Sequence, residues 1–255
     1  IDPDPARAWL GDRSVPVFCR LEAQTGVCIV SEVGHLWIAT SDEIDTLVEA
    51  DLRFGLGCSR HDAAGLGSAF PNLSVPGGLQ GLFQPDRAGY LDPRAYVRAE
   101  GLAFGSAGGT VLEALVTSVR DIGTTVLIET SAGTITADRA VLATGAFFAH
   151  GDTPAASLDL AVGTHTMLTV EIPPAEAERL ADLPSLILKP GEPGRDCFVL
   201  SRKTLSDGRA VVKIAVSHQG LRLTVDEITA WFRTDGDPEQ ADRQEGLLMD
   251  LLPGL

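Results

Sequence analysis

The segment whose residues could most clearly take part in a reaction is an apolar run interrupted by one cation. Residues 209–220 read RAVVKIAVSHQG, so Lys213 stands among branched and small apolar residues and His218 follows five positions later. The run predicts a strand because it is rich in valine and isoleucine and follows the turn residues Asp207 and Gly208. A lysine in such a strand either faces solvent or is buried with a partner. A buried ammonium beside a cofactor would act strongly, because the local dielectric constant is low.

A second segment that could contribute to a functional site contains a predicted strand that ends at a glycine. Residues 111–148 read VLEALVTSVRDIGTTVLIETSAGTITADRAVLATGAFF, and turn residues divide them into short β segments. Residues 140–143 are apolar at every position, which predicts a strand buried on both faces, as in the parallel sheet of a doubly wound domain. The strand would end at Thr144 and Gly145, where the missing Cβ lets backbone or a flat ligand come close. The alternative is an ordinary buried strand and a hairpin.

Several other kinds of site are excluded by residue spacing. No CxxC pair, HxxxH pair or GxSxG sequence is present, so we expect no metal site and no serine-hydrolase elbow. Gly55-x-Gly57 and Gly65-x-Gly67 lack the third glycine and the strand–helix context of a dinucleotide fingerprint, and we interpret both as turns. The cysteines are expected to be buried reduced thiols of a cytoplasmic protein: Cys19, Cys28, Cys58 and Cys197.

Composition limits the classes of partner. The chain has 255 residues, 44% hydrophobic and 22% charged, which is typical of one large globular domain or two small ones. The net charge of −15 argues against a nucleic-acid partner, because binding to phosphates is carried by lysine and arginine. No apolar stretch approaches the roughly 20 residues of a membrane span. We therefore expect a small-molecule partner, no nucleic acid and no membrane, and the oligomeric state stays open.

The elements that must position these residues alternate between helix and strand. Asp92 and Pro93 are a good N-cap and first residue of a helix. Thr40-x-x-Glu43 and Thr224-x-x-Glu227 are capping boxes. Helices are predicted at residues 15–25, 40–54, 93–106, 174–181, 224–231 and 238–252. Strands are predicted at residues 27–39 with a hairpin at 32–34, and at 79–84, 164–172, 186–188, 197–201 and 209–217. These strands would form a mostly antiparallel sheet.

Three of these features together resemble a known family. They are the β-meander that leads to Ala-Thr-Gly-Ala at residues 143–146, the Gly89-x-x-Asp-Pro sequence before a helix, and the lysine strand followed by His-x-Gly at residues 218–220. This combination resembles the FAD-dependent amine and amino-acid oxidoreductases related to sarcosine oxidase and D-amino-acid oxidase. The resemblance implies FAD as the cofactor.

The resemblance also implies roles for particular residues. The positions expected to border FAD are Val116, Ala143, Thr144, Gly145 and Ala146, with Val116 beside the adenine. In the sarcosine oxidase group, a lysine at the position of Lys213 faces the flavin ring and promotes the reaction of reduced flavin with oxygen. His218 matches a histidine near the substrate, although the spacing from the lysine is one residue longer here.

The resemblance implies an α/β and α+β fold of two interleaved parts. Residues 1–22 and 87–155 would belong to an incomplete, doubly wound FAD-binding domain. Residues 23–86 and 156–255 would form a substrate domain, built on a mostly antiparallel sheet flanked by helices, with a terminal helix. The N-terminal pyrophosphate loop and the C-terminal segment of the family have no counterpart in the sequence. None of the four cysteines matches the one that binds flavin covalently in some relatives.

The implied activity is oxidation of the C–N bond of a secondary amine or amino acid. Hydride would pass to flavin N5, the resulting imine would be hydrolysed, and oxygen or another acceptor would reoxidise the flavin. Two alternatives stay open: a cofactor-free scaffold or binding remnant of the same fold, and a longer coding sequence. An outward-facing Lys213 and an ordinary loop histidine at His218 are likewise open.

Overall fold

A computed structural model describes residues 2–205, 207–217 and 220–255. Its contacts divide the chain into two compact units. Unit 1 contains Ile1–Gly109, Thr166–His218 and Asp237–Leu255, and unit 2 contains Thr110–His165 and Gln219–Gly236. The expected assignment of segments to an FAD domain and a substrate domain stays a prediction.

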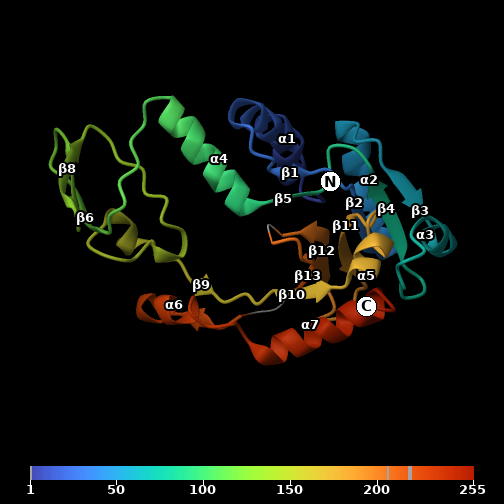
Figure 1. Ribbon diagram of the computed structural model, residues 1–255. Helices are drawn as coiled ribbons and strands as arrows, with labels where there is room; N and C mark the ends of the chain where they lie inside the picture. The colour runs from blue at the N-terminus through green and yellow to red at the C-terminus, as the bar shows by residue number, and fades with distance from the viewer. Residues whose placement is uncertain (1, 206, 218–219) are drawn as a thin grey trace. The chain divides into compact units, whose positions relative to one another are not determined.

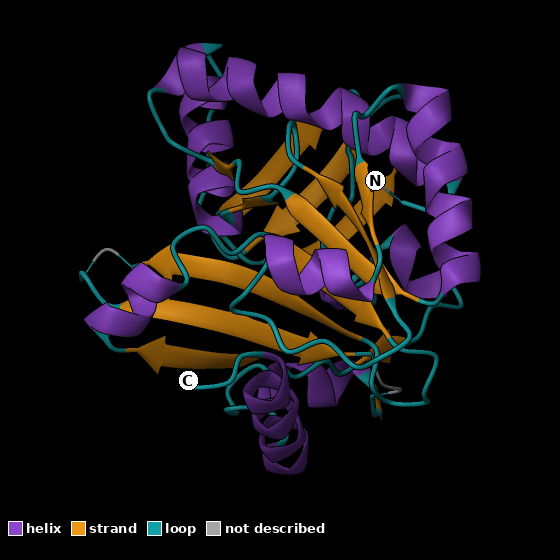
Figure 2. Ribbon diagram, turned by 90° about the vertical axis from the view of Figure 1, so that its right-hand side faces the viewer, coloured by secondary structure: helices purple, strands orange, loops and turns teal. Residues whose placement is uncertain are grey.

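Unit 1 is built on a seven-stranded sheet in the described part of the chain, visible as the large strand layer in Figure 2. The strand order is β10-β13-β12-β11-β2-β4-β3. Only the β11–β2 pair is parallel, so the expected mostly antiparallel sheet is confirmed. The strands are β2 (His35–Ala39), β3 (Ser59–His61), β4 (Gln80–Gln84), β10 (Leu168–Ile172), β11 (Ser185–Lys189), β12 (Cys197–Thr204) and β13 (Ala210–Val216).

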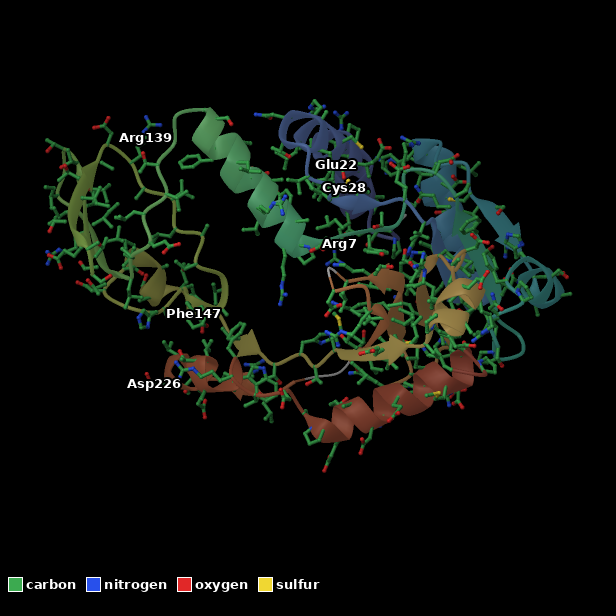
Figure 3. All side chains as sticks on the ribbon, in the orientation of Figure 1. Arg7, Glu22, Cys28, Arg139, Phe147 and Asp226 are labelled. Carbon is green, nitrogen blue, oxygen red and sulfur yellow. The ribbon has the colours of Figure 1, made fainter. Side chains whose placement is uncertain are left out.

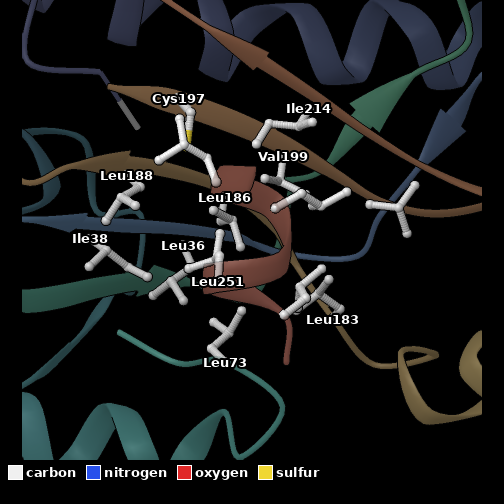
Figure 4. Close-up of a cluster of buried hydrophobic side chains, with 14 of the residues drawn as sticks. Leu36, Ile38, Leu73, Leu183, Leu186, Leu188, Cys197, Val199, Ile214 and Leu251 are labelled. Carbon is white, nitrogen blue, oxygen red and sulfur yellow. The ribbon is translucent and has the colours of Figure 1, made fainter. Parts of the chain in front are cut away.

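One face of this sheet carries the main hydrophobic core. Side chains alternate along each strand, so Val212, Ile214 and Val216 of β13 lie on the same face. They pack in one cluster with Leu248 and Leu251 of helix α7 (Pro238–Leu251). Figure 4 shows this cluster, which also includes leucines of β2 and β11. Complete burial of each such side chain is worth roughly 1.5–3 kcal/mol. Two short helices also contribute to this cluster: α3 (Ala63–Ala69) through Leu66, and α5 (Pro174–Arg179) through Ala177.

The opposite face is covered in part by helix α2 (Ser41–Phe54). Its Ile44 and Leu47 form a separate cluster with Trp37 of β2 and Leu82 of β4. The predicted helix is confirmed, but the expected capping box at its start is wrong, since Thr40 makes no side-chain cap hydrogen bond. Acidic residues in the first turn favour the helix N-terminus through its dipole instead.

Helices α1 (Pro5–Thr25) and α4 (Pro93–Ser106) pack against each other in unit 1, as Figure 1 shows. Helix α1 begins ten residues before the predicted position 15, because Asp4 caps it and Pro5 is its first residue. The predicted hairpin at residues 32–34 is wrong. Strand β1 (Val30–Ser31) pairs with β5 (Tyr90–Leu91), whereas β2 pairs with β4 and β11.

Unit 2 contains the predicted β-meander, in the order β6-β7-β8. Its strands are β6 (Val116–Asp121), β7 (Val126–Thr130) and β8 (Gly133–Ala137). The short strands β9 (Val162–Gly163) and β14 (Arg222–Leu223) pair with each other. Helix α6 (Val225–Trp231) begins with the predicted Thr224–Glu227 capping box, which is confirmed. Two 3-10 turns complete the unit: η1 (Gly145–Phe147) and η2 (Pro154–Ser157).

The strand expected at residues 140–143 is wrong. These residues have no regular secondary structure, and Val141 is 91% exposed. A strand is stable only when a neighbour accepts and donates its backbone hydrogen bonds, and no strand in the described part of the chain pairs with this segment. Gly145 then takes a left-handed φ of 53° at the start of η1.

No helix formed by the described residues is both long and apolar enough to cross a bilayer.

Candidate functional site

Lys213 lies on the face of the unit 1 sheet opposite the main core. Its neighbours on β13, Val212 and Ile214, face the core, so Lys213 faces the other way. Its cross-strand partners are Leu200 of β12 and Thr169 of β10, and neither is charged. The lysine is half-buried. The two side chains directly opposite the ammonium group of Lys213 are therefore uncharged.

The three lysines of the chain share this sheet face. Lys189, Lys203 and Lys213 are the only lysines in the sequence, and they lie on the neighbouring strands β11, β12 and β13. Lys189 pairs with Glu43 at 3.6 Å and lies 5.1 Å from the ring centroid of Trp37. Lys203 forms a close ion pair with Asp92. The ammonium group of Lys213 makes no ion pair or hydrogen bond with any residue that the structure describes.

Sequence reasoning missed a polar group on the same face, at His35. Its Nδ1 lies 2.9 Å from the hydroxyl of Ser185, which also donates to the carbonyl of Gly34 at 3.0 Å. A hydroxyl has one proton, so the imidazole donates through Nδ1 in this arrangement. Burial lowers the pKa of His35 to about 3, which keeps the ring neutral. The only sequence signal was its position at the start of an apolar strand.

His35 and Gln84 line a cavity of about 350 Å³ in unit 1. They are directly opposite each other on β2 and β4. Arg87, which also lines the cavity, pairs with Asp12 of α1 at 2.6 Å. The cavity thus combines a neutral imidazole, a buried amide and a neutralised guanidinium.

Unit 2 contains a second cavity, of about 580 Å³, with mainly apolar walls. It brings together Val116 and Thr144, two of the residues expected to border the cofactor, although they are 28 positions apart. Phe147 also lines it and stacks on Phe232 with 5.5 Å between ring centroids. Phe147 is labelled in Figure 3. Apolar walls of this kind suit a flat aromatic ring such as adenine.

The remaining predicted site residues lie outside the wall of this cavity or outside the described part of the chain. Ala143, Gly145 and Ala146 lie next to the cavity-lining residues in the chain but do not line the cavity themselves. Val116 and Ala143 are exposed. His218 lies outside the described residues, so its expected place near a substrate stays a prediction.

The cysteines offer no activated thiol in the sites above. Burial raises the pKa of Cys58 to about 12 and that of Cys197 to about 11, so both stay protonated. The expectation of buried thiols is wrong for Cys19 and Cys28, which are exposed. All four are free. No group of metal-binding side chains occurs among the residues described.

Comparison with solved structures reveals the same fold in amino-acid oxidoreductases. NikD, an amino acid oxidase of nikkomycin biosynthesis, superposes with a TM-score of 0.71 at 21% identity, over 96% of this chain and 63% of its own. L-proline dehydrogenase from P. horikoshii superposes with a TM-score of 0.72 at 16% identity, over 100% of this chain and 64% of its own. Glycine oxidase from Geobacillus kaustophilus superposes with a TM-score of 0.67 at 19% identity, over 93% of this chain and 59% of its own. The chain therefore spans about three fifths of the length of these proteins.

The match at the level of the family covers nearly every residue. No curated protein sequence matches the chain. The profile of the DAO family, described as FAD dependent oxidoreductase, matches residues 2–255. Since the profile accounts for almost the whole sequence and the fold agrees with it, the chain belongs to the FAD-dependent oxidoreductase (DAO) family.

Proposed function

We propose that the chain forms part of an FAD-dependent oxidase or dehydrogenase that acts on a secondary amine or an amino acid. When bound, FAD supplies the redox chemistry by accepting a hydride from the carbon next to nitrogen, and the imine product is then hydrolysed. The substrates named for the structural neighbours, which include glycine and L-proline, support a small amine or amino acid. The expected cytoplasmic location stays a prediction.

The observation that carries this proposal is that the ammonium group of Lys213 has no ion-pair partner among the described residues. A cation without a carboxylate partner is suited to stabilise negative charge that forms during a reaction. Lys213 would hold such charge beside the cofactor, and its half-burial limits screening by water. Leu200 and Thr169 would border it without competing for its charge.

The cavity of unit 2 supports a second part of the proposal. Its apolar walls would take up a flat aromatic ring, with Val116 and Phe147 in contact and Thr144 at the rim. Ala143, Gly145 and Ala146 would contribute backbone close to the same group. This assignment predicts that a bulky charge at Val116, as in Val116→Glu, weakens FAD binding.

The test of the main proposal replaces Lys213 with methionine, which keeps the length of the side chain and removes the charge. In flavin-loaded protein, we expect Lys213→Met to slow oxidation of the reduced flavin by oxygen roughly 100-fold. The measurement is stopped-flow absorbance of the flavin band. Lys189→Met is the matched control, because that lysine lies on the same sheet face but already has a carboxylate partner. Equal rates in Lys213→Met and the unmodified protein would refute the role of Lys213.

A cofactor-free scaffold is the second candidate function. It is favoured by the exposed apolar residues 140–143, which do not form a strand. Visible absorbance of the purified protein after addition of FAD separates the two candidates. Flavin bands that survive gel filtration support the oxidoreductase, whereas a colourless protein that ignores FAD supports the scaffold.

A further inference from the structure

A β-bulge decides which lysines share the face of Lys213. Leu200 pairs with Lys213 and Lys203 pairs with Val211, so β12 has one residue more than β13 between these pairs. In a regular ladder, Arg202 would stand opposite Val211. The extra residue turns Lys203 to the face of Val211 and Lys213. Lys203 therefore becomes a diagonal neighbour of Lys213, a relation that typically separates two residues by about 7–8 Å.

Asp92 neutralises this neighbouring lysine while it caps a helix. Its Oδ1 accepts hydrogen bonds from the backbone N–H groups of Arg94 at 2.9 Å and Ala95 at 3.2 Å, at the start of α4. Its Oδ2 forms the ion pair with Lys203. The hydrogen bond from Lys203, followed by those from the backbone, holds the pKa of Asp92 below its usual value. Both side chains of the pair are about 70% shielded from solvent.

The other charged neighbour of Lys213 also has an ion-pair partner. Glu171 lies on the same face of β10, opposite Val211, and accepts a bond of 3.0 Å from Arg209. Arg209 also pairs with Asp207 at 2.8 Å. The two charged side chains diagonal to Lys213, Lys203 and Glu171, therefore each have a partner of opposite sign. Among the three lysines, Lys213 alone makes no ion pair with a residue that the structure describes.

We infer that Asp92 is a positioning residue: its ion pair with Lys203 leaves Lys213 as the one lysine of this sheet face that has no carboxylate partner among the described residues. This inference deepens the proposed role of Lys213 and rests on it for its functional meaning. The ligand that such a face selects is an anionic or electron-accepting group, because a single uncompensated ammonium attracts negative charge. Without Asp92, Lys203 would also attract the negative charge of the ligand. Repulsion between the two ammonium groups would then favour the neutral form of the Lys213 amine.

The experiment measures how fast the Lys213 amine reacts with trace acetic anhydride, by mass spectrometry of the lysine peptides. The chain has only three lysines, so each is read separately. Asp92→Asn keeps a good helix cap but removes the charge. We expect it to raise the reactivity of Lys213 roughly threefold to tenfold at low ionic strength, and less at 1 M salt. Unchanged reactivity of Lys213 would overturn the inference.

A second variant separates charge repulsion from local unfolding. Adding Lys203→Met to Asp92→Asn removes the released cation, and the reactivity of Lys213 is expected to return to that of the unmodified protein. Failure to return would overturn the inference, because a disturbed helix would then explain the change. Asp237→Asn is the matched control: Asp237 also precedes a proline and caps α7 through Glu239 and Gln240, and the structure gives it no ion pair. It should leave Lys213 unchanged.

The same labelling separates this inference from the proposed function. FAD added before the reagent should protect Lys213 if the lysine faces the cofactor. If FAD gives no protection while Asp92→Asn still raises the reactivity, the role of Asp92 stands and the proposed function of Lys213 falls.

Discussion

At the scale of single residues, the chemistry of unit 1 depends on which polar groups have partners. His35 is held by Ser185 and stays neutral. The side chain of Lys213 has no ion-pair partner among the described residues. Both residues lie on the sheet face opposite the main core.

The half-buried imidazole of His35 predicts how stability depends on pH. The pKa of His35 is about 3 in the folded protein, against about 6.5 for an unfolded chain. Below pH 6.5, the unfolded state therefore binds a proton that the folded state does not, and stability falls as the pH falls. Between pH 6.5 and 5.0 the loss attributable to His35 is about 2 kcal/mol. Urea unfolding of His35→Gln at these two pH values should show a difference smaller by that amount.

The control for this prediction is His150→Gln, at a histidine that is exposed. It should retain the pH dependence of the unmodified protein. If His35→Gln retains that dependence as well, the imidazole is protonated in the folded state and its assignment as a neutral group is wrong.

At the scale of elements, close approach of two backbones determines how the β5 strand is placed. Gly89 precedes β5 and has a φ of 149°, and a Cβ built there would lie 2.0 Å from the carbonyl oxygen of Ser31 in β1. The β1–β5 pair leads directly to Asp92, which caps α4. A displacement of β5 would therefore also displace the carboxylate that holds Lys203.

We expect Gly89→Ala to destabilise the protein by about 3 kcal/mol, because the added methyl group must push the two backbones apart. Thermal or urea unfolding measures the change. Gly78→Ala is the control, since Gly78 has a φ of 84° but no heavy atom near its Cβ position. It should cost only about 1 kcal/mol, from the left-handed backbone alone. Equal losses in the two variants would show that the contact with Ser31 is unimportant.

At the scale of the whole molecule, the two units differ in how much apolar surface they bury. Unit 1 contains all three hydrophobic clusters of the described residues. In the described part of unit 2, only Val119 and Ile228 are fully buried apolar side chains. Burial of apolar area is the main favourable term in folding, so the two units should not be equally stable.

Hydrogen exchange tests this difference. The amides of β6, β7 and β8 should exchange well before those of β11, β12 and β13, because local opening of a unit with few buried contacts costs less free energy. Mass spectrometry of peptides from one sample compares both sets under identical conditions. Similar protection of the meander and the large sheet would contradict the prediction.

The features that local sequence signals predicted are those whose cause is local. The Asp92-Pro93 and Asp237-Pro238 starts of α4 and α7 and the capping box of α6 occur as predicted, because a cap needs only side chains and backbone within one turn. The strands β12 and β13 likewise follow from short runs of branched apolar residues next to turn residues. The same strand signal failed at residues 140–143, where composition was right but no neighbouring strand completes the hydrogen bonds.

The amino-acid sequence by itself determined that Lys213 lies within an apolar strand and that a meander leads to the Thr144–Gly145 turn. Only the tertiary structure decided that all three lysines share one sheet face, that a bulge brings Lys203 there, and that Asp92 neutralises it. It also decided that the half-buried His35 is held by Ser185, 150 positions away. The physical reason is register: a shift of one residue moves a side chain to the other face, and pairing between distant strands sets that register.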